Sequence, residues 1–274
     1  MSGMKIHPTA LVEKGAQLGE NVLVGPFCHI GSEAVIGDGC SLMSHVVIMG
    51  KTTLGANSKV FSHAVLGKEP QNNKHKGGCT TLSIGKNCVI REGVTMHRGS
   101  DSSIGMTIVG DNCQFFCYAH VAHDCHVGNH VTFANNAMIA GHVTVGDYVI
   151  IGGGSAVHQF VRIGHHAFIG GVSALVGDLI PYGTAVGVQA KLAGLNIIGM
   201  KRAGLERKDI HALRHAVAML FDRSKPFKER VCDVSSCYST SRSVLDVVNF
   251  IKEEGRRFYC TPKLQDDRLK VNKD

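Results

Sequence analysis

Several histidines and amides recur at a regular interval along the chain. The chain of 274 residues contains 16 histidines. Adding 18 to the number of His123 reaches Gly141, which is beside His142, and adding 36 reaches Gln159, which is beside His158. Imidazole is the side chain best suited to proton transfer near neutral pH. If the chain repeats at this interval, these residues form a column along one edge of the molecule, and we predict a functional site there.

His123 is the candidate base of this column. Asp124 follows it and offers a carboxylate that would orient the imidazole or raise its basicity. Because adjacent side chains of a strand point to opposite faces, this contact requires a corner or a twist. His120 is expected to reach the same groove, and Asn135 and Asn136 add amides. No Ser or Cys stands out as a nucleophile beside the column, so direct transfer assisted by a base is the simpler hypothesis.

The histidines leave a metal site as an alternative. Three histidines can hold Zn²⁺ with a fourth position open for water. In this chain the histidines alternate with amides, which suits hydrogen bonding to a polar ligand. We therefore expect neither a metal nor a cofactor. A zinc protein similar to the hexapeptide-repeat carbonic anhydrases is the alternative from another class.

A hexapeptide period indicates how the column is positioned. A hydrophobic residue stands at every sixth position from Ile6 to Leu66, from Ile84 to Met96 and from Val109 to Leu175, and all of these residues except Phe115 and Phe133 are aliphatic. This gives 26 hexapeptides, many with a small or β-branched residue four places after the aliphatic one. Such a pattern fits neither a helix nor a hairpin. It predicts an all-β solenoid, the left-handed parallel β-helix, in which three hexapeptides form one triangular coil.

The cysteines fit the same pattern. Five of the ten occupy the small inward position and are expected to pack as small hydrophobic residues: Cys28, Cys40, Cys88, Cys113 and Cys125. The absence of CxxC pairs, and an N-terminus without an apolar signal region, indicate reduced thiols in the cytoplasm. No apolar run approaches the roughly 18 residues of a membrane span, so we expect no integral membrane segment.

The sequence predicts two domains. Residues 1–184 form the β-helix, with two extruded loops at about 68–83 and 99–107. The first loop contains Gln71, Asn72 and Lys74, a polar and basic set that suits an anionic ligand. Residues 185–274 show helical periodicity and are expected to form a C-terminal α-helical domain with a basic surface. From Cys260 onward a polar tail is expected.

Charge differs between the two domains. Residues 1–184 hold 11 Lys and Arg and 11 Asp and Glu, whereas residues 185–274 hold 18 and 11. A nucleic-acid surface would be one explanation of the basic excess. A dock for an acidic carrier protein explains a neutral prism beside a basic cap better, and we expect no nucleic acid as partner.

Motifs of the histidine column resemble one enzyme family. Residues 119–125, 134–137, 140–143 and 156–160 are similar to those of UDP-N-acetylglucosamine acyltransferases of lipid A biosynthesis, and the resemblance extends over nearly the whole chain. It implies transfer of a 3-hydroxyacyl group from acyl carrier protein to the 3-position of UDP-N-acetylglucosamine. An exposed prism edge is not a pocket, so we expect a homotrimer with its active sites between subunits.

The resemblance implies roles for individual residues. His123 would be the general base, Asp124 would assist it, and the Gly141 N–H would donate to the oxyanion. The absence of a side chain at Gly171 implies room for a longer acyl chain. The residues that it places at the substrates are Gln71, Asn72, Lys74, His120, Asn135, Asn136, His142, His158, Gln159, Gly171, Asn196 and Arg202.

Three positions depart from the common pattern of the family. Asn72 stands where an Asp is common, Ile198 where a Glu occurs and Ala203 where an Arg occurs. One consequence is that a 3-amino sugar remains an alternative acceptor, which would give an amide. A related N-acyltransferase carries an additional N-terminal domain, whereas here the coils begin almost at once. A non-catalytic scaffold is a further alternative.

Overall fold

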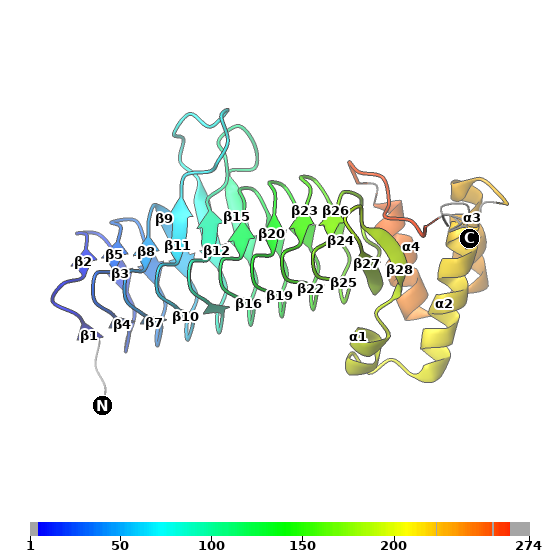
Figure 1. Cartoon of the computed structure of the whole chain (residues 1–274), viewed down its shortest axis with the longest axis horizontal. Coiled ribbons are helices and arrows are strands. Elements are labelled where there is room, and N and C mark those ends of the chain that lie inside the picture. The colour runs from blue at the N-terminus through cyan, green and yellow to red at the C-terminus, as the bar shows by residue number, and fades with distance from the viewer. Residues whose placement is uncertain (1–4, 223, 254, 264–274) are drawn as a thin grey trace, which may run out of the picture.

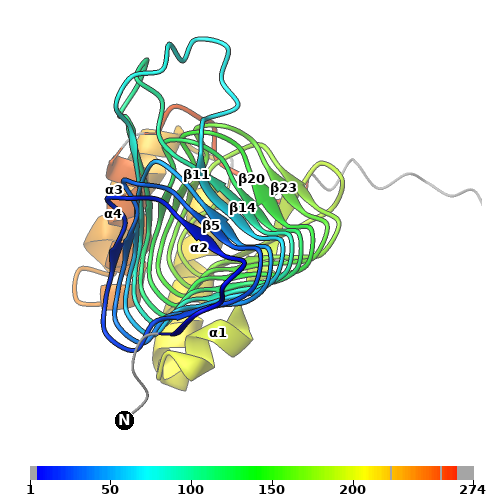
Figure 2. The same cartoon turned by 90° about the vertical axis from the view of Figure 1, so that its left-hand side faces the viewer.

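The computed structural model describes residues 5–222, 224–253 and 255–263. Its strands β1 to β26 each contain one of the 26 hydrophobic positions of the hexapeptide series, as predicted. The coils stack into a three-sided prism, and helices cover one end of it (Figure 1; Figure 2). Each side of the prism is one sheet, and the chain visits the three sheets in turn.

Neighbouring strands of each sheet come from successive coils and are hydrogen-bonded to one another. Sheet 1 contains β1 (Lys5–Ile6), β4 (Leu23–Val24), β7 (Ser41–Leu42), β10 (Lys59–Val60), β13 (Val89–Ile90), β16 (Gln114–Phe115), β19 (Thr132–Phe133), β22 (Ile150–Ile151), β25 (Phe168–Ile169), β27 (Gly183–Val186) and β28 (Lys191–Leu195). Sheet 2 contains β2 (Leu11–Val12), β5 (His29–Ile30), β8 (Val47–Ile48), β11 (Val65–Lys68), β14 (Thr95–His97), β17 (His120–Val121), β20 (Met138–Ile139), β23 (Ala156–Val157) and β26 (Ala174–Leu175). Sheet 3 contains β24 (Arg162–Ile163), β21 (Thr144–Val145), β18 (His126–Val127), β15 (Met106–Val109), β12 (Thr81–Ile84), β9 (Lys51–Leu54), β6 (Val35–Ile36) and β3 (Gln17–Leu18).

The register between coils is three hexapeptides, except where a loop is inserted and at the last coil, where Phe168 pairs with Thr184 only 16 residues further on. Lys5 pairs with Leu23, for example, and both strands run parallel. Across the first loop Lys51 pairs with Thr81, whereas in a coil without an insertion it would pair with Glu69. The loop therefore adds the length of two hexapeptides. Across the second loop Thr81 pairs with Met106, where such a coil would offer Gly99.

The two loops lie side by side. The first connects β11 to β12, and the second connects β14 to β15. Figure 2 shows both extending together from the prism. Because each loop leaves sheet 2 and returns in sheet 3, both are inserted at the same edge of the prism.

The turns between sheets form three corners, which are named by the sheets that they join. At the corner between sheets 2 and 3 (the 2–3 corner), Asp124, His142 and Phe160 have left-handed backbone, with φ of 58°, 63° and 65°. Residues other than glycine adopt this region with some strain. Because the turn recurs from coil to coil, its side chains project outward in columns along each corner.

Mostly aliphatic side chains fill the interior, and the five inward cysteines are buried among them, as expected. Four of their thiols donate to the carbonyl 15 residues further on, which lies in the next coil. The pairs are Cys28 with Met43, Cys40 with Gly55, Cys113 with Gly128 and Cys125 with Ala140, at S···O distances of 2.7–3.2 Å. Burial raises the pKa of Cys125 to about 12. These thiols therefore pack and close the turns rather than act as nucleophiles.

After β26 the chain makes one more parallel strand, β27, and an antiparallel one, β28. Sheet 1 thus continues beyond residue 184. The helices follow: α1 (Ile197–Arg202), α2 (Arg207–Phe221), α3 (Phe227–Cys237) and α4 (Arg242–Lys252). In α2 the buried residues Ile210, Leu213, Val217 and Leu220 recur at helical spacing. No described helix combines the length and the hydrophobicity needed to cross a membrane.

The described chain continues after α4 as far as Lys263 and lies against the prism. Cys260 is buried there, and its N–H donates to the carbonyl of Asp178 at 2.7 Å. The polar tail that we expect from Cys260 onward falls mostly on residues 264–274, which lie outside the described residues.

Candidate active site

Three successive turns of the 2–3 corner carry the predicted histidine column. They contain His123 and Asp124, then Gly141 and His142, then Gln159 and Phe160, and backbone hydrogen bonds stack them. The N–H of His142 donates to the carbonyl of His123 at 3.1 Å. Both loops leave the prism at this corner, since they too join sheet 2 to sheet 3.

His123 and Asp124 form a hydrogen-bonded pair. His123 Nδ1 lies 2.7 Å from Asp124 Oδ2. The left-handed turn at Asp124 supplies the corner that this contact between neighbours requires. The His123 side chain is 12% exposed, and that of Asp124 is fully buried. An ionised carboxylate only accepts, so Nδ1 carries the proton and Nε2 has a lone pair that can take a proton from a ligand.

Asp124 also holds the second loop. Its carboxylate accepts the N–H of Ser100 at 3.1 Å and that of Gly105 at 2.9 Å, and its own N–H donates to Thr107 Oγ1 at 2.8 Å. Ser100 and Gly105 lie near the two ends of the loop. Asp124 therefore fixes the orientation of His123 and the path of the loop beside it, and sequence reasoning missed this second contact.

Gly141 lies directly against the imidazole of His123. A Cβ added to Gly141 would be 2.8 Å from His123 Cε1 and 2.9 Å from Nε2, closer than real Cβ contacts come. The residue is thus glycine because the ring occupies the space of a side chain. Gly141 is buried, and its N–H makes no hydrogen bond to another described residue.

His142 extends the site away from His123. Its ring meets the His123 ring edge-on, with centroids 5.2 Å apart, and stacks on Phe160 at 4.5 Å. His142 Nδ1 lies 3.3 Å from the Ser103 hydroxyl of the second loop. Burial lowers the pKa of His142, so the ring is neutral at pH 7.

His120 and His97 lie on the other side of His123. His120 Nδ1 lies 2.7 Å from Thr95 Oγ1, and burial, together with the charge of His123, lowers its pKa. The His97 ring meets that of His120 edge-on at 5.1 Å. His97 is only 7% exposed, and its Nδ1 is buried without a partner among the described residues. Burial, followed by the charges of His120 and His123, lowers the pKa of His97 to about 4.

Sequence reasoning missed His97 because the second loop hides its register. β14 pairs with β17 with Thr95 opposite His120, whereas a coil without an insertion would place Cys113 opposite Thr95. A search at intervals of three hexapeptides therefore passes His97 by. Correcting the interval for the inserted loop would find it.

The first loop packs on the second. Asn72 Nδ2 donates to the Ser100 hydroxyl at 3.2 Å, and Asn72 Oδ1 accepts the N–H of Lys74 at 3.0 Å. His75 Nδ1 lies 3.1 Å from Asp101 Oδ1. Gln71 and Lys74 are exposed. The loop pair therefore presents polar groups beside the corner that holds His123.

His158 and Gln159 lie one coil beyond Gly141 and are exposed. They meet a residue that sequence reasoning did not single out. Arg257, from the segment after α4, has Nη2 2.7 Å from His158 Nδ1, and its Nε donates to the Gln159 carbonyl at 2.9 Å. No sequence pattern connects residues so far apart in the chain.

Three of the predicted residues lie at a different corner of the same chain. Asn135 and Asn136 join β19 to β20, and Gly171 joins β25 to β26, so all three belong to the corner between sheets 1 and 2 (the 1–2 corner). Gly153 stands between them in the column, since the N–H of Val172 donates to its carbonyl. Within one chain this corner is not part of the His123 site.

Asn196 and Arg202 lie at the third corner, between sheets 3 and 1. They line a cleft of about 1470 Å³ between the prism and the helices, together with Ile198 and Ala203. The Asn196 side chain is engaged: Oδ1 accepts the N–H of Gly199 at 2.9 Å, which caps α1, and Nδ2 donates to the His166 carbonyl at 2.8 Å. One chain thus distributes the predicted residues over three corners.

The donor set at the 2–3 corner also has the composition of a metal site. One ligand atom each from His123, Asp124 and His142 lies within 4.8 Å of the others. The Asp124 oxygens, however, already accept two backbone N–H groups and the His123 ring. These bonds fit an orienting carboxylate better than a metal ligand.

Comparison with known proteins identifies the family. Residues 178–259 match the model described as UDP N-acetylglucosamine O-acyltransferase, domain 2, and residues 106–141 match that of the bacterial transferase hexapeptide. The chain is 92% identical over 274 residues to a protein of Bartonella quintana and 89% identical over 274 residues to one of Bartonella henselae, and both alignments cover the two chains completely. Each relative is named acyl-[acyl-carrier-protein]–UDP-N-acetylglucosamine O-acyltransferase.

The solved structure of LpxA from Acinetobacter baumannii matches with a TM-score of 0.90 at 36% identity, covering 93% of this chain and 99% of that one. The predicted fold, a left-handed parallel β-helix with helices after it, is confirmed. The chain therefore belongs to the acyl-[acyl-carrier-protein]–UDP-N-acetylglucosamine O-acyltransferase family.

Proposed function

We propose that this chain transfers a 3-hydroxyacyl group from acyl carrier protein to the 3-position of UDP-N-acetylglucosamine, the first step of lipid A biosynthesis. The observation that carries the proposal is the His123–Asp124 pair at 2.7 Å, with Gly141 against the ring. Relatives of 89% and 92% identity carry the name of this activity.

In the proposed reaction His123 Nε2 removes the proton of the 3-hydroxyl as the sugar oxygen attacks the thioester carbonyl. Asp124 keeps the ring oriented and stabilises the imidazolium that forms. The Gly141 N–H donates to the oxyanion of the tetrahedral intermediate. The C–S bond then breaks, and the proton on His123 goes to the leaving sulfur. The products are an ester and the free thiol of the carrier protein.

The remaining predicted residues are proposed to bind the substrates. Exposure of Gln71 and Lys74 on the first loop, and of His158 and Gln159 on the corner, suits contacts to the nucleotide sugar. His120 and His142, on either side of His123, would orient the sugar. Asn72 is held by the second loop, so it would act mainly by shaping the loop pair.

We propose that the site is completed by a second copy of the chain in a homotrimer. Asn135, Asn136 and Gly171 lie at the 1–2 corner, and Asn196 and Arg202 at the third, away from His123 of the same chain. A threefold assembly of three-sided prisms would set the 2–3 corner of one copy against another corner of the next. Gly171 would then line the acyl groove, and the exposed Arg202 would meet the carrier protein.

The decisive test is to incubate the purified protein with UDP-N-acetylglucosamine, its 3-amino analogue and a series of 3-hydroxyacyl carrier proteins, and to determine the masses of the products by mass spectrometry. Ester formation on UDP-N-acetylglucosamine is the expected result. If product formed only with the 3-amino analogue, the acceptor would be the 3-amino sugar and the new bond an amide. His123→Ala should lower the rate about 100-fold or more, and a folded His123→Ala protein with the wild-type rate would refute the assigned base.

A zinc protein is the second candidate, because His123, Asp124 and His142 could hold an ion. Elemental analysis of protein purified without added metal discriminates the two candidates, since the acyltransferase proposal expects no stoichiometric zinc. A cytoplasmic location is proposed from the ten free cysteines, which suit a reducing compartment.

A further inference from the structure

The segment after α4 folds back onto the prism and reaches the 2–3 corner. We call residues 255–263 the C-terminal strap. The N–H of Asp178 donates to the carbonyl of Phe258 at 2.8 Å, and the N–H of Leu192 donates to that of Thr261 at 3.0 Å. At Gly255 an added Cβ would collide with the Asp178 carboxylate and the Arg162 guanidinium. The strap is therefore held on the prism by backbone bonds and by a close approach that requires glycine.

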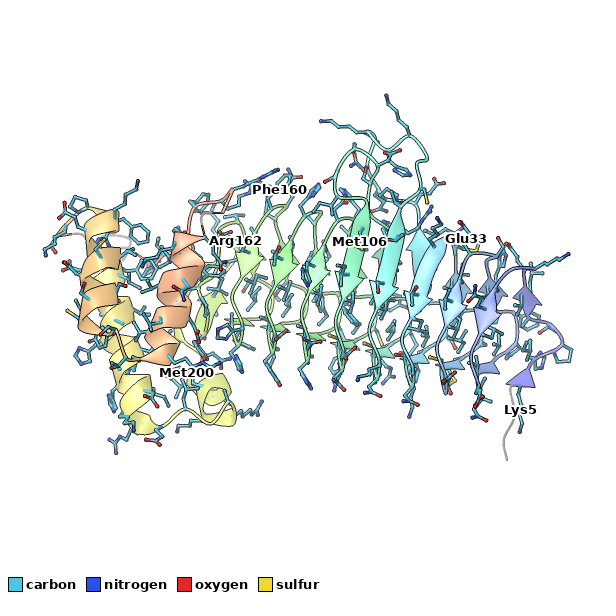
Figure 3. The ribbon with its side chains drawn as sticks, turned by 180° about the vertical axis from the view of Figure 1, so that it is seen from behind. Lys5, Glu33, Met106, Phe160, Arg162 and Met200 are labelled. Carbon is cyan, nitrogen blue, oxygen red and sulfur yellow. The ribbon has the colours of Figure 1, made fainter. Side chains whose placement is uncertain are left out.

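The strap places two arginines on the last turn of the histidine column. Figure 3 shows Phe160 on the side of the prism from which the two loops extend. The Arg256 guanidinium lies over the Phe160 ring, 4.8 Å from its centroid. Arg257 instead reaches the two residues before Phe160, with Nη2 2.7 Å from His158 Nδ1 and Nε 2.9 Å from the Gln159 carbonyl.

The Arg257 contact determines which nitrogen of His158 carries the proton. A guanidinium has five donors and no acceptor, so His158 Nδ1 must accept. The ring is then neutral, with its proton on Nε2. The contact of His158 Nδ1 with the Gln159 carbonyl at 3.3 Å is consequently not a hydrogen bond, because both atoms accept. One planar fork thus orients the ring and the neighbouring backbone together.

We propose that Arg257 is a positioning residue of the nucleotide-sugar site: it holds His158 as a neutral Nε2–H donor, and Gln159 beside it, for a hydroxyl or diphosphate oxygen of the ligand. This inference rests on the proposed function, which places His158 and Gln159 at the nucleotide sugar. Arg256 makes no hydrogen bond to either residue among the described atoms.

The test compares Arg257→Met, Arg257→Lys and the matched control Arg256→Met, which removes the same charge from the neighbouring position. The Michaelis constant for UDP-N-acetylglucosamine and kcat are measured at saturating 3-hydroxyacyl carrier protein, and the dissociation constant of UDP-N-acetylglucosamine is measured by calorimetry. Arg257→Met should raise the Michaelis constant and the dissociation constant of UDP-N-acetylglucosamine about tenfold. The kcat should change less than about threefold, because the arginine acts on binding. Arg257→Lys, which can replace only one of the two bonds, should fall between Arg257→Met and the wild type.

Three results would overturn the inference. The first is an Arg257→Met protein with the wild-type Michaelis and dissociation constants. The second is an equal effect of Arg256→Met, which would assign the effect to charge alone. The third, which decides the matter if Arg257→Met does not fold, is an Arg257→Lys protein that binds like the wild type. A wild-type protein that forms no product would count against the proposed function, whereas the calorimetric comparison still tests Arg257.

Discussion

Replacement of Gly141 by Ala tests the active site with a single methyl group. The position tolerates the backbone of an L-residue, since its φ lies outside the left-handed region. The new Cβ, however, would stand 2.8 Å from His123 Cε1. The atoms nearest to it all belong to the imidazole of His123, so the ring has to move and the backbone does not.

The size of the effect follows from this displacement. Ordinary contact begins at 3.4 Å, so the ring must retreat by about 0.6 Å. The bond of 2.7 Å between His123 and Asp124 would stretch or tilt by a similar amount. Misplacement of a reacting group by about 1 Å costs about 100-fold in rate. We expect kcat to fall roughly 10- to 100-fold, which is about 1.4–2.7 kcal/mol of activation free energy, with a thermal midpoint close to that of the wild type.

The assay follows ester formation by mass spectrometry at saturating substrates, and the control is a double-mutant cycle. In His123→Ala the space beside Gly141 is empty, so adding Gly141→Ala should have no further effect. If Gly141→Ala lowered the rate by the same factor with and without the His123 ring, the steric explanation would be wrong. A Gly141→Ala protein with the wild-type kcat would refute the geometry of the pair itself.

Four further predictions concern neighbouring groups. In Asp124→Asn only one side-chain oxygen remains to accept from Ser100, Gly105 and the His123 ring. We expect kcat to fall about 100-fold or more and hydrogen exchange at the N–H groups of Ser100 and Gly105 to accelerate. His97 has a folded pKa of about 4, below the usual 6.5, so its contribution to stability is complete above pH 6.5 and is lost as pH falls to 4. Urea unfolding at pH 7 and pH 4 should therefore show the wild type losing about 3 kcal/mol more than His97→Gln, and equal losses would contradict the burial argument. Arg202→Glu should raise the Michaelis constant for acyl carrier protein about tenfold, and the difference from the wild type should shrink at high salt. Dialysis against a zinc chelator should leave acyl transfer unchanged, and loss of transfer that zinc restores would favour the metal candidate.

The repeat made most of the fold predictable. Hydrophobic residues at every sixth position define 26 strands because each strand is short and pairs only with the coil before and after it. Local spacing then determines the register of three hexapeptides per coil, as between Lys5 and Leu23. The loop-free exception is the last coil, where the repeat ends and Phe168 pairs with Thr184. The inward cysteines followed from the same phase.

The candidate site was predictable to the same extent. His123, Gly141 and Gln159 could be placed on one corner by counting, since they lie in uninterrupted coils. His97 could not, because the second loop is inserted between it and the column and shifts the count. The pairing of His123 with Asp124 depended on one left-handed backbone angle, which spacing does not give.

The sequence by itself determined the coils, the corner that carries His123 and the family motifs, because all of these are local and periodic. Only the tertiary structure decided which distant residues meet. Arg257 reaches His158 from the segment after α4, and Asp124 holds a loop through backbone N–H groups that carry no sequence signal. The tertiary structure also places Asn135, Gly171 and Arg202 at corners other than that of His123. The physical reason is that residues of a prism are neighbours only when they project from the same corner or face.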